Sequence, residues 1–261
     1  MYRSLGEYDK AIADFSQCIP LSPPGYGTYW SNRGISYYEK GDLDAALADF
    51  NKSIEVWSEP DYAGFALLYR GLVWKKKGDI DRALADFTQA AAYYPNNTDA
   101  LYQAGYIWFT RQDYEKAIEY FSGAIAVWGD NADYRVARGV SYWSKSRRDK
   151  IGFWDEGGGI ISLAEEDFTR AIECAPDMAG AYLDRGTVRC FKALESDNLI
   201  KAILTQKVTD DAGRALMLAR LGNMGGQRPC SPSRRHSEGA PFQPGPGRPA
   251  HGQKFRSFCG V

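Results

Sequence analysis

The chain has 261 residues, of which 44% are hydrophobic and 25% are charged, and its formal net charge is −1 at pH 7. This composition indicates a soluble protein with enough residues for an extended core, and no segment is apolar enough to predict a membrane span. The amino terminus lacks a charged start followed by an apolar run, so we expect no signal peptide and a cytoplasmic location, although a truncated start would have removed such a signal.

The chain opens with residues whose spacing fits the second half of a helical hairpin. Ala11, Phe15 and Cys18 lie four and three residues apart, so they share one helix face. Only the end of a preceding helix is visible, around Tyr2 and Gly6. Because an uncovered apolar face is a liability, we interpret the chain as a fragment of a longer protein or as one with a misassigned start; an atypical capping unit is the alternative.

A fixed spacing recurs along the next 150 residues or so. Gly34, Gly71 and Gly105 are each followed 12 residues later by an alanine and 16 residues later by a phenylalanine. Gly139 precedes the same two residue types by 25 and 29 residues. This difference indicates 13 residues inserted between two helices, without disturbing either helix.

Each recurrence predicts two antiparallel helices. Trp30, Gly34 and Tyr37 fall on one face of a first helix, and the Gly41-Asp42 turn ends that helix and caps the next. The second helix is predicted over Leu43 to Val56. Because one helix pair cannot bury its apolar face alone, the pairs must stack on one another.

These residues resemble the tetratricopeptide repeat, a 34-residue helix-turn-helix with a large residue, a glycine and an aromatic on its first helix and alanine, aromatic, alanine and a closing proline on its second. Closing prolines stand eight residues beyond the second-helix aromatic at Pro23, Pro95 and Pro176. The resemblance covers residues 1–191 well and 192–224 poorly. It implies an all-α, right-handed superhelical solenoid of about five to six repeats over residues 1–221, with a truncated first repeat and atypical last helices.

The pattern departs from the family at three places, which are Gly129 for a proline, Arg135 for the first large residue and Arg189 for an aromatic.

A recurring polar pair predicts a contact within each repeat. An arginine precedes the repeat glycine at Arg33, Arg70, Arg138 and Arg185, and an aspartate precedes the second-helix phenylalanine at Asp14, Asp49, Asp86 and Asp167. In the repeat around Gly105 both are absent, because Ala104 and Tyr120 take their places. Joint loss indicates contact, so we predict the ion pairs Arg33–Asp49, Arg70–Asp86 and Arg138–Asp167 between the helices of one repeat.

The insertion falls near residues 147–159 and places Phe153 and Trp154 on a loop. Exposed loop aromatics favour partner binding, and packing of both rings onto the repeats is the alternative. The run Gly157-Gly158-Gly159 has no following Lys-Ser or Lys-Thr and no preceding strand, so we interpret it as a flexible loop end and not as a phosphate-binding loop.

Composition changes abruptly at Gly222. Residues 222–261 hold eight of the 27 glycines and six of the 12 prolines, so we predict a disordered tail. The tail has six Lys or Arg against one Glu, a formal charge of +5, which leaves −6 for residues 1–221. A basic tail can bind nucleic acid or another polyanion, but its stacking groups are few and we interpret it as passive; out-of-frame translation would also produce such a segment.

The residue inventory disfavours catalysis and predicts no cofactor. The two histidines, His236 and His251, lie in the tail, which excludes a histidine-based triad, a zinc site or a histidine base from the repeats. We interpret the adjacent carboxylates Glu165-Glu166 and Asp210-Asp211 as solvated. Five cysteines are scattered singly, without metal or disulfide spacing, at Cys18, Cys174, Cys190, Cys230 and Cys259.

The inner wall of the predicted solenoid is formed by the first helices, on the face turned away from the second helices. Counting around each first helix assigns an apolar, aromatic-rich strip to this wall: Ile35, Tyr38, Phe65, Leu68, Leu72, Tyr102, Tyr106, Phe109, Val136, Val140 and Trp143. Such a strip suits a peptide, a partner helix or another protein, although some of these side chains will pack between adjacent first helices.

The family's clamp of lysines and asparagines for the terminal carboxylate of a peptide is not matched. Its candidates are Lys75, Lys76 and Asn32, their neighbours on the wall are apolar, and positive charge is also favoured at a helix carboxyl end.

The sequence therefore predicts a non-catalytic protein-interaction scaffold. The alternatives are a basic-tailed adaptor for nucleic acid or another polyanion, and a fragment of a larger multidomain protein whose activity lies elsewhere. The identity of the partner and the oligomeric state stay open.

Overall fold

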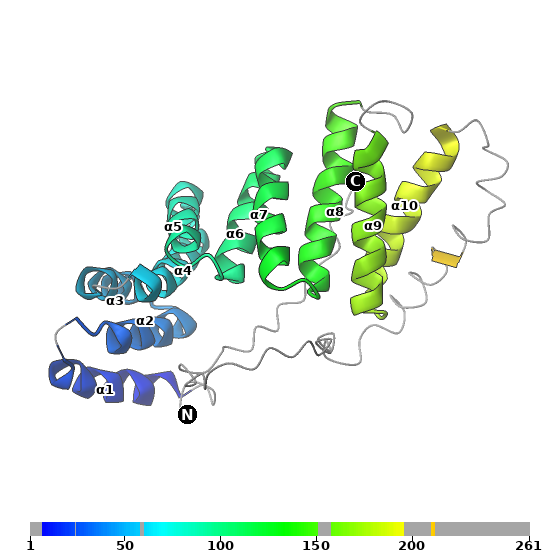
Figure 1. Ribbon diagram of the computed structural model, residues 1–261. Coiled ribbons are helices and arrows are strands. Elements are labelled where there is room, and N and C mark those ends of the chain that lie inside the picture. The colour runs from blue at the N-terminus through cyan, green and yellow to red at the C-terminus, as the bar shows by residue number, and fades with distance from the viewer. Residues whose placement is uncertain (1–6, 24, 58–59, 151–157, 196–209, 212–261) are drawn as a thin grey trace, which may run out of the picture. The chain divides into compact units, whose positions relative to one another are not determined.

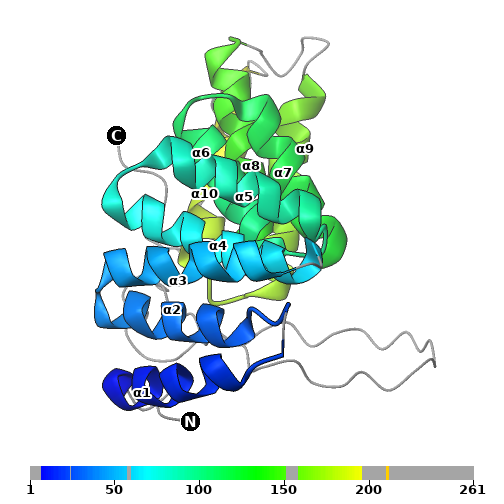
Figure 2. The same ribbon diagram turned by 90° about the vertical axis from the view of Figure 1, so that its left-hand side faces the viewer.

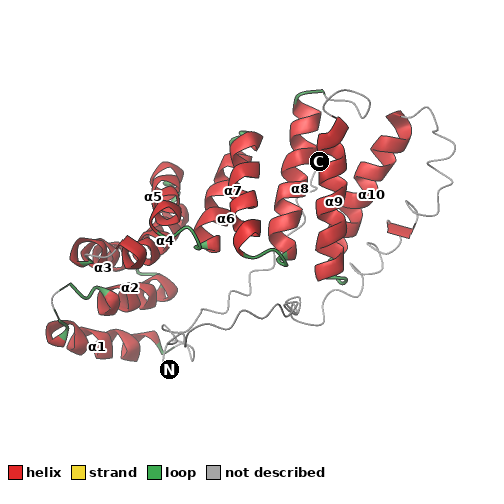
Figure 3. Cartoon of the chain, viewed as in Figure 1, coloured by secondary structure: helices red, strands yellow, loops and turns green. Residues whose placement is uncertain are grey.

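A computed structural model describes residues 7–23, 25–57, 60–150, 158–195 and 210–211. Every regular element within these residues is helical (Figures 1 and 3). The α-helices are α1 (Tyr8–Cys18), α2 (Thr28–Lys40), α3 (Leu43–Val56), α4 (Pro60–Lys77), α5 (Ile80–Tyr93), α6 (Thr98–Thr110), α7 (Tyr114–Val127), α8 (Ala132–Arg148), α9 (Gly158–Cys174) and α10 (Ala179–Glu195), and the 3-10 helix η2 (Ile19–Leu21) follows α1. The predicted all-α class is confirmed.

The chain forms two units, Met1–Gly129 (unit 1) and Asp130–Val261 (unit 2). In unit 1, α2 with α3, α4 with α5, and α6 with α7 form successive helical hairpins, and α1 packs on α2. Figure 2 shows α1 to α4 lying side by side in order along the chain. In unit 2, α8 pairs with α9, and α10 packs on α9.

Capping residues at the hairpin turns set where the helices begin. The Asp42 side chain accepts a hydrogen bond from the Ala45 backbone N–H, and α3 begins at Leu43 as predicted. Gly41 ends α2 with a φ of 93°, a left-handed conformation that glycine adopts without a Cβ clash. The same cap bond recurs at the start of other helices, where the side-chain acceptors are Asp79, Asn97, Asp113 and Asn131.

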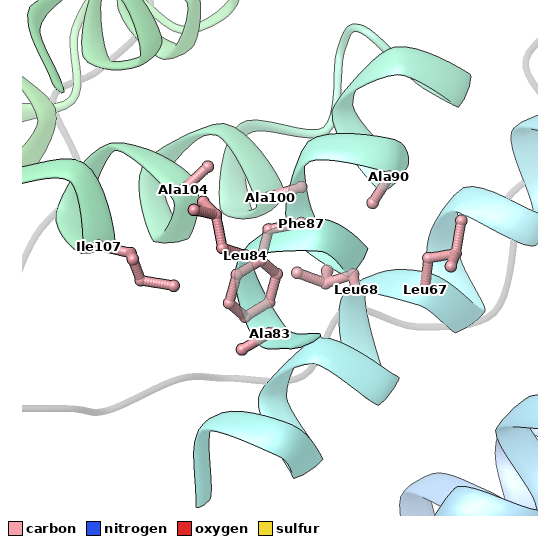
Figure 4. Close-up of a cluster of buried hydrophobic side chains, with 9 residues drawn as sticks. All are labelled: Leu67, Leu68, Ala83, Leu84, Phe87, Ala90, Ala100, Ala104 and Ile107. Carbon is pink, nitrogen blue, oxygen red and sulfur yellow. The ribbon is translucent and has the colours of Figure 1, made fainter. Parts of the chain in front are cut away.

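The core of each hairpin is a phenylalanine ring packed against a glycine. A Cβ added to Gly71 would lie 2.6 Å from Cε1 of Phe87, so the ring occupies the space that any larger residue needs. Figure 4 shows Phe87 of α5 among side chains from α4 and α6, including Leu68 and Ile107, in one buried cluster. The cluster therefore joins one hairpin to the next through side-chain packing.

The insertion in the fourth hairpin leaves the packing of its two helices like that of the others: a Cβ added to Gly139 of α8 would lie 2.8 Å from Cε1 of Phe168 of α9. Both α8 and α9 contain 17 residues, a length between the 14 of α7 and the 18 of α4, whose hairpin has no insertion. Gly158 and Gly159 belong to α9, which overturns their interpretation as a loop end. Phe153 and Trp154 lie outside the described residues, as do residues 1–6 and the tail from Gly222 onward.

Candidate functional site

The predicted arginine–aspartate pairs are confirmed in all three hairpins. Arg33 Nε and Nη2 each donate to a carboxylate oxygen of Asp49 at 2.7 Å, and Arg70 binds Asp86 at 2.8 and 2.7 Å in the same two-pronged manner. Arg138 binds Asp167 at 2.8 and 2.7 Å. Because the three aspartates are buried, these pairs fix the two helices of a hairpin against each other.

The arginine also reaches the preceding hairpin, which the sequence had not revealed. Arg33 Nη1 donates to Ser16 Oγ of α1 at 2.9 Å, and Arg70 Nη1 donates to Asn51 Oδ1 of α3 at 2.7 Å. Where the arginine is missing, the Tyr120 hydroxyl lies 3.5 Å from Thr88 Oγ1, at the equivalent place in the preceding helix. The link between hairpins is thus kept when the link within the hairpin is lost.

Two carboxylates interpreted as solvated are ion-pair partners, Asp211 buried and Glu165 half-buried, which corrects that interpretation. Asp211 is buried and accepts hydrogen bonds from Arg185 and Arg189 of α10. Glu165 of α9 accepts hydrogen bonds from Arg189 and Lys192, at 2.7 and 2.8 Å. Burial opposes ionisation of Glu165, but these two hydrogen bonds outweigh it and hold the pKa of Glu165 below its ordinary value.

The first-helix wall of unit 1 is only partly accessible. Ile35 and Leu68 are buried and belong to the core clusters, and Tyr102 is also buried, so these three are withdrawn from the candidate surface. Phe65 is 40% exposed. The remaining wall residues of unit 1 are partly exposed, namely Tyr38, Leu72, Tyr106 and Phe109.

In unit 2 the predicted wall residues are divided in the same way. Val140 is buried, and Val136 packs against a cluster that includes Tyr182. Trp143 is partly exposed, and its ring meets Phe191 of α10 edge to face with 5.0 Å between ring centroids. Among the predicted wall residues of α8, Trp143 therefore combines an accessible surface with a neighbouring aromatic ring.

Two lysines lie within the aromatic wall of unit 1. Lys75 Nζ donates to Gln103 Oε1 of α6 at 2.8 Å and lies 5.0 Å from the centroid of the Tyr106 ring. Lys76 Nζ lies 5.0 Å from the centroid of the Tyr38 ring of α2. Burial lowers the pKa of Lys75. Gln103 was not predicted, although its position three residues before Tyr106 places it on the same helix face.

The described residues bring together no group of three or more His, Cys, Asp and Glu side chains that could hold a metal ion. Among the described helices, none is both long and apolar enough to cross a membrane.

Comparison with known proteins gives a family and several solved structures. A family model described as tetratricopeptide repeat matches residues 2–60 and 70–133. The chain is 18% identical to YrrB, described as a TPR protein with an unusual peptide-binding site, with a TM-score of 0.60 over 79% of this chain and 92% of that one. It is 20% identical to MamA, with a TM-score of 0.56 over 72% of this chain and 95% of that one.

A third structure is the C-terminal part of a TPR repeat-containing protein from Cytophaga hutchinsonii, 16% identical with a TM-score of 0.62 over 85% of this chain and 78% of that one. No curated protein matches the chain. At these identities the likeness to solved structures concerns the fold alone.

Proposed function

We propose, from the premise that this chain belongs to the tetratricopeptide-repeat family, that it is a non-catalytic scaffold whose first-helix wall in unit 1 binds an extended peptide segment of a partner protein. The observation that carries this proposal is the set of accessible aromatic side chains on successive first helices. Phe65 on α4 is 40% exposed, and Tyr38 on α2 and Tyr106 on α6 are partly exposed. Aromatic side chains that become buried by a partner are the commonest energetic anchors of protein interfaces.

The wall differs from a random scatter of exposed apolar residues, because Tyr38, Phe65 and Tyr106 come from the three successive first helices α2, α4 and α6. Such an arrangement suits a chain segment that crosses several helices in turn. The peptide-binding site named for YrrB gives a precedent on a similar fold, and the fold likeness does not transfer its residues to this chain.

Peptides selected from a display library on the full-length chain test this proposal. We expect Phe65→Ala and Tyr106→Ala each to weaken binding of a selected peptide about 10- to 30-fold, the effect of removing an interface hot spot. Tyr93→Ala is the matched control, because Tyr93 is an exposed tyrosine at the end of second helix α5. Selected peptides that bind all three variants as tightly as the unchanged chain would contradict the proposal.

A further inference from the structure

We propose that the peptide bound by unit 1 is acidic, and that Lys75 and Lys76 hold its side-chain carboxylates while apolar neighbours in the same peptide pack on the flanking aromatic rings. This inference rests on the proposed function, and it names the chemistry of the partner at the same wall. It concerns carboxylates within a peptide and not the terminal carboxylate of a chain.

The pairing of charges in unit 1 is the main support. Residues 7–129, as far as the structure describes them, contain eleven lysines and arginines, and nine of these have a carboxylate oxygen within 4.0 Å. Lys75 and Lys76 are the two exceptions among these described residues, and both lie on the wall of accessible aromatics. The described cations of unit 1 that have no carboxylate oxygen within 4.0 Å are therefore concentrated at one place.

The two lysines are directed toward different helices that neighbour α4. Adjacent residues on a helix point about 100° apart. Lys75 accordingly contacts α6 through Gln103, whereas Lys76 contacts Tyr38 of α2. Favourable charge at a helix end explains a basic last turn, but it does not explain why these ammonium groups lie against neutral partners. An acidic side chain would supply the counter-charge to each.

Burial of Lys75 strengthens this argument. Its partial burial lowers the pKa of the ammonium group, because desolvation disfavours the charged form. A carboxylate placed beside Nζ would offset that cost, and a charge-assisted hydrogen bond is stronger than the present one to a neutral amide. The neighbouring Lys77 already has a carboxylate partner, since it forms an ion pair with Asp44 at 2.6 Å.

Charge complementarity favours a short acidic peptide over the other occupants of this wall. The chain's own segment 222–261 carries a formal charge of +5, and residues 1–221 with −6 attract it as a whole, but beside Lys75 and Lys76 it would place like charges together. A nucleic acid needs a row of cations along its phosphates, whereas this wall offers two cations flanked by Leu72 and by the rings of Tyr38 and Tyr106. Neighbouring helices lie about 8–10 Å apart, so an extended peptide that crosses from α2 to α6 needs about six residues.

The test uses two pools of fluorescently labelled hexapeptides and the full-length chain. One pool has Glu at both central positions and Leu, Phe, Tyr or Ser at the flanking four, and the matched pool has Gln at the centre. All peptides are acetylated and amidated, so the side chains carry the only carboxylates. We expect the Glu pool to bind about tenfold more tightly at low salt, as measured by anisotropy.

The double variant Lys75→Gln/Lys76→Gln should reduce this preference to within about twofold, with an unchanged melting temperature. Lys77→Gln is the matched control, because it removes the same charge from the next residue of α4, and it should keep the preference. Equal affinity of the two pools, or equal loss in the control, would overturn the inference. Tighter binding of a twelve-nucleotide single-stranded DNA than of the Glu pool would also overturn it.

The same experiment separates the inference from the proposed function. A display-selected peptide that is weakened by Phe65→Ala but binds the double lysine variant normally would leave the proposed function standing and overturn the acidic preference. Absence of binding by the display-selected peptides and by both pools would overturn both.

Discussion

At the scale of single residues, one arginine joins three helices. Arg70 binds Asp86 within its own hairpin and Asn51 in the hairpin before it, and Arg33 makes the equivalent contacts. The guanidinium group suits this position because its planar fork offers two donors to a carboxylate and leaves others for a third group. A lysine, with a single nitrogen, cannot reproduce the arrangement.

The arginine–aspartate pair makes a prediction about stability. Arg70→Ala leaves Asp86 buried without its counter-charge, so we expect a loss of about 3 kcal/mol in the free energy of unfolding. The double variant Arg70→Ala/Asp86→Tyr reproduces the natural combination of Ala104 with Tyr120, and its new hydroxyl can reach Asn51. We expect this double variant to recover to within about 1 kcal/mol of the unchanged chain.

Urea unfolding followed by circular dichroism measures both variants. Lys77→Ala serves as the control, because it breaks an exposed pair with Asp44 and should cost at most about 1 kcal/mol. If the double variant is as unstable as Arg70→Ala, the pair is not the reason for the covariation of the two positions.

At the scale of helices, close approach within each hairpin depends on the glycine of the first helix. Gly34, Gly71, Gly105 and Gly139 all face a phenylalanine ring so closely that a Cβ would lie 2.6–2.9 Å from a ring carbon. Helix propensity alone favours alanine over glycine by about 1 kcal/mol. The packing requirement therefore opposes the propensity at these positions, and it is the larger effect because the ring is fully buried.

Two glycine substitutions separate packing from propensity. Gly71→Ala should destabilise the chain by about 1–3 kcal/mol, because the Phe87 ring must move. Gly123→Ala in α7 should instead stabilise it by up to about 1 kcal/mol, because the nearest heavy atom, on Leu101, would be 3.5 Å away. Thermal unfolding of both variants gives the signs, and destabilisation by Gly123→Ala as large as that by Gly71→Ala would count against the steric explanation.

Sequence periodicity was sufficient for the helices and the buried ion pairs, because both depend on short-range spacing. The Gly41-Asp42 turn correctly predicted where the helix Leu43–Val56 begins. The spacing also predicted the ion pair between Arg138 and Asp167, although the insertion separates these residues in the chain. The separation of core from surface was not predictable, because the burial of Ile35 and Leu68 depends on how closely successive first helices approach. The sequence likewise could not predict that Lys75 has a neutral amide as its hydrogen-bond partner while most other cations of unit 1 have a carboxylate.

At the scale of the whole molecule, the contacts concentrate between helices that follow one another in the chain. In such a stack, stability is approximately a sum over hairpins and the interfaces between neighbours. The elements that hold Lys75 and Lys76, which are α2, α4 and α6, all belong to unit 1. Folding and peptide binding by unit 1 should therefore depend little on residues beyond Gly129.

A pair of truncations tests this modularity. Residues 1–129 end between hairpins, and we expect this fragment to unfold cooperatively and to bind the Glu pool within about threefold of the full chain. Residues 1–112 end within a hairpin, so this fragment lacks Phe121, which packs against Gly105 of α6. Without α7 to cover it, α6 no longer holds Gln103 beside Lys75. This shorter fragment should lose the helical signal of α6 and bind about tenfold more weakly. Equal behaviour of the two fragments would show that the hairpin is not the unit on which the wall depends.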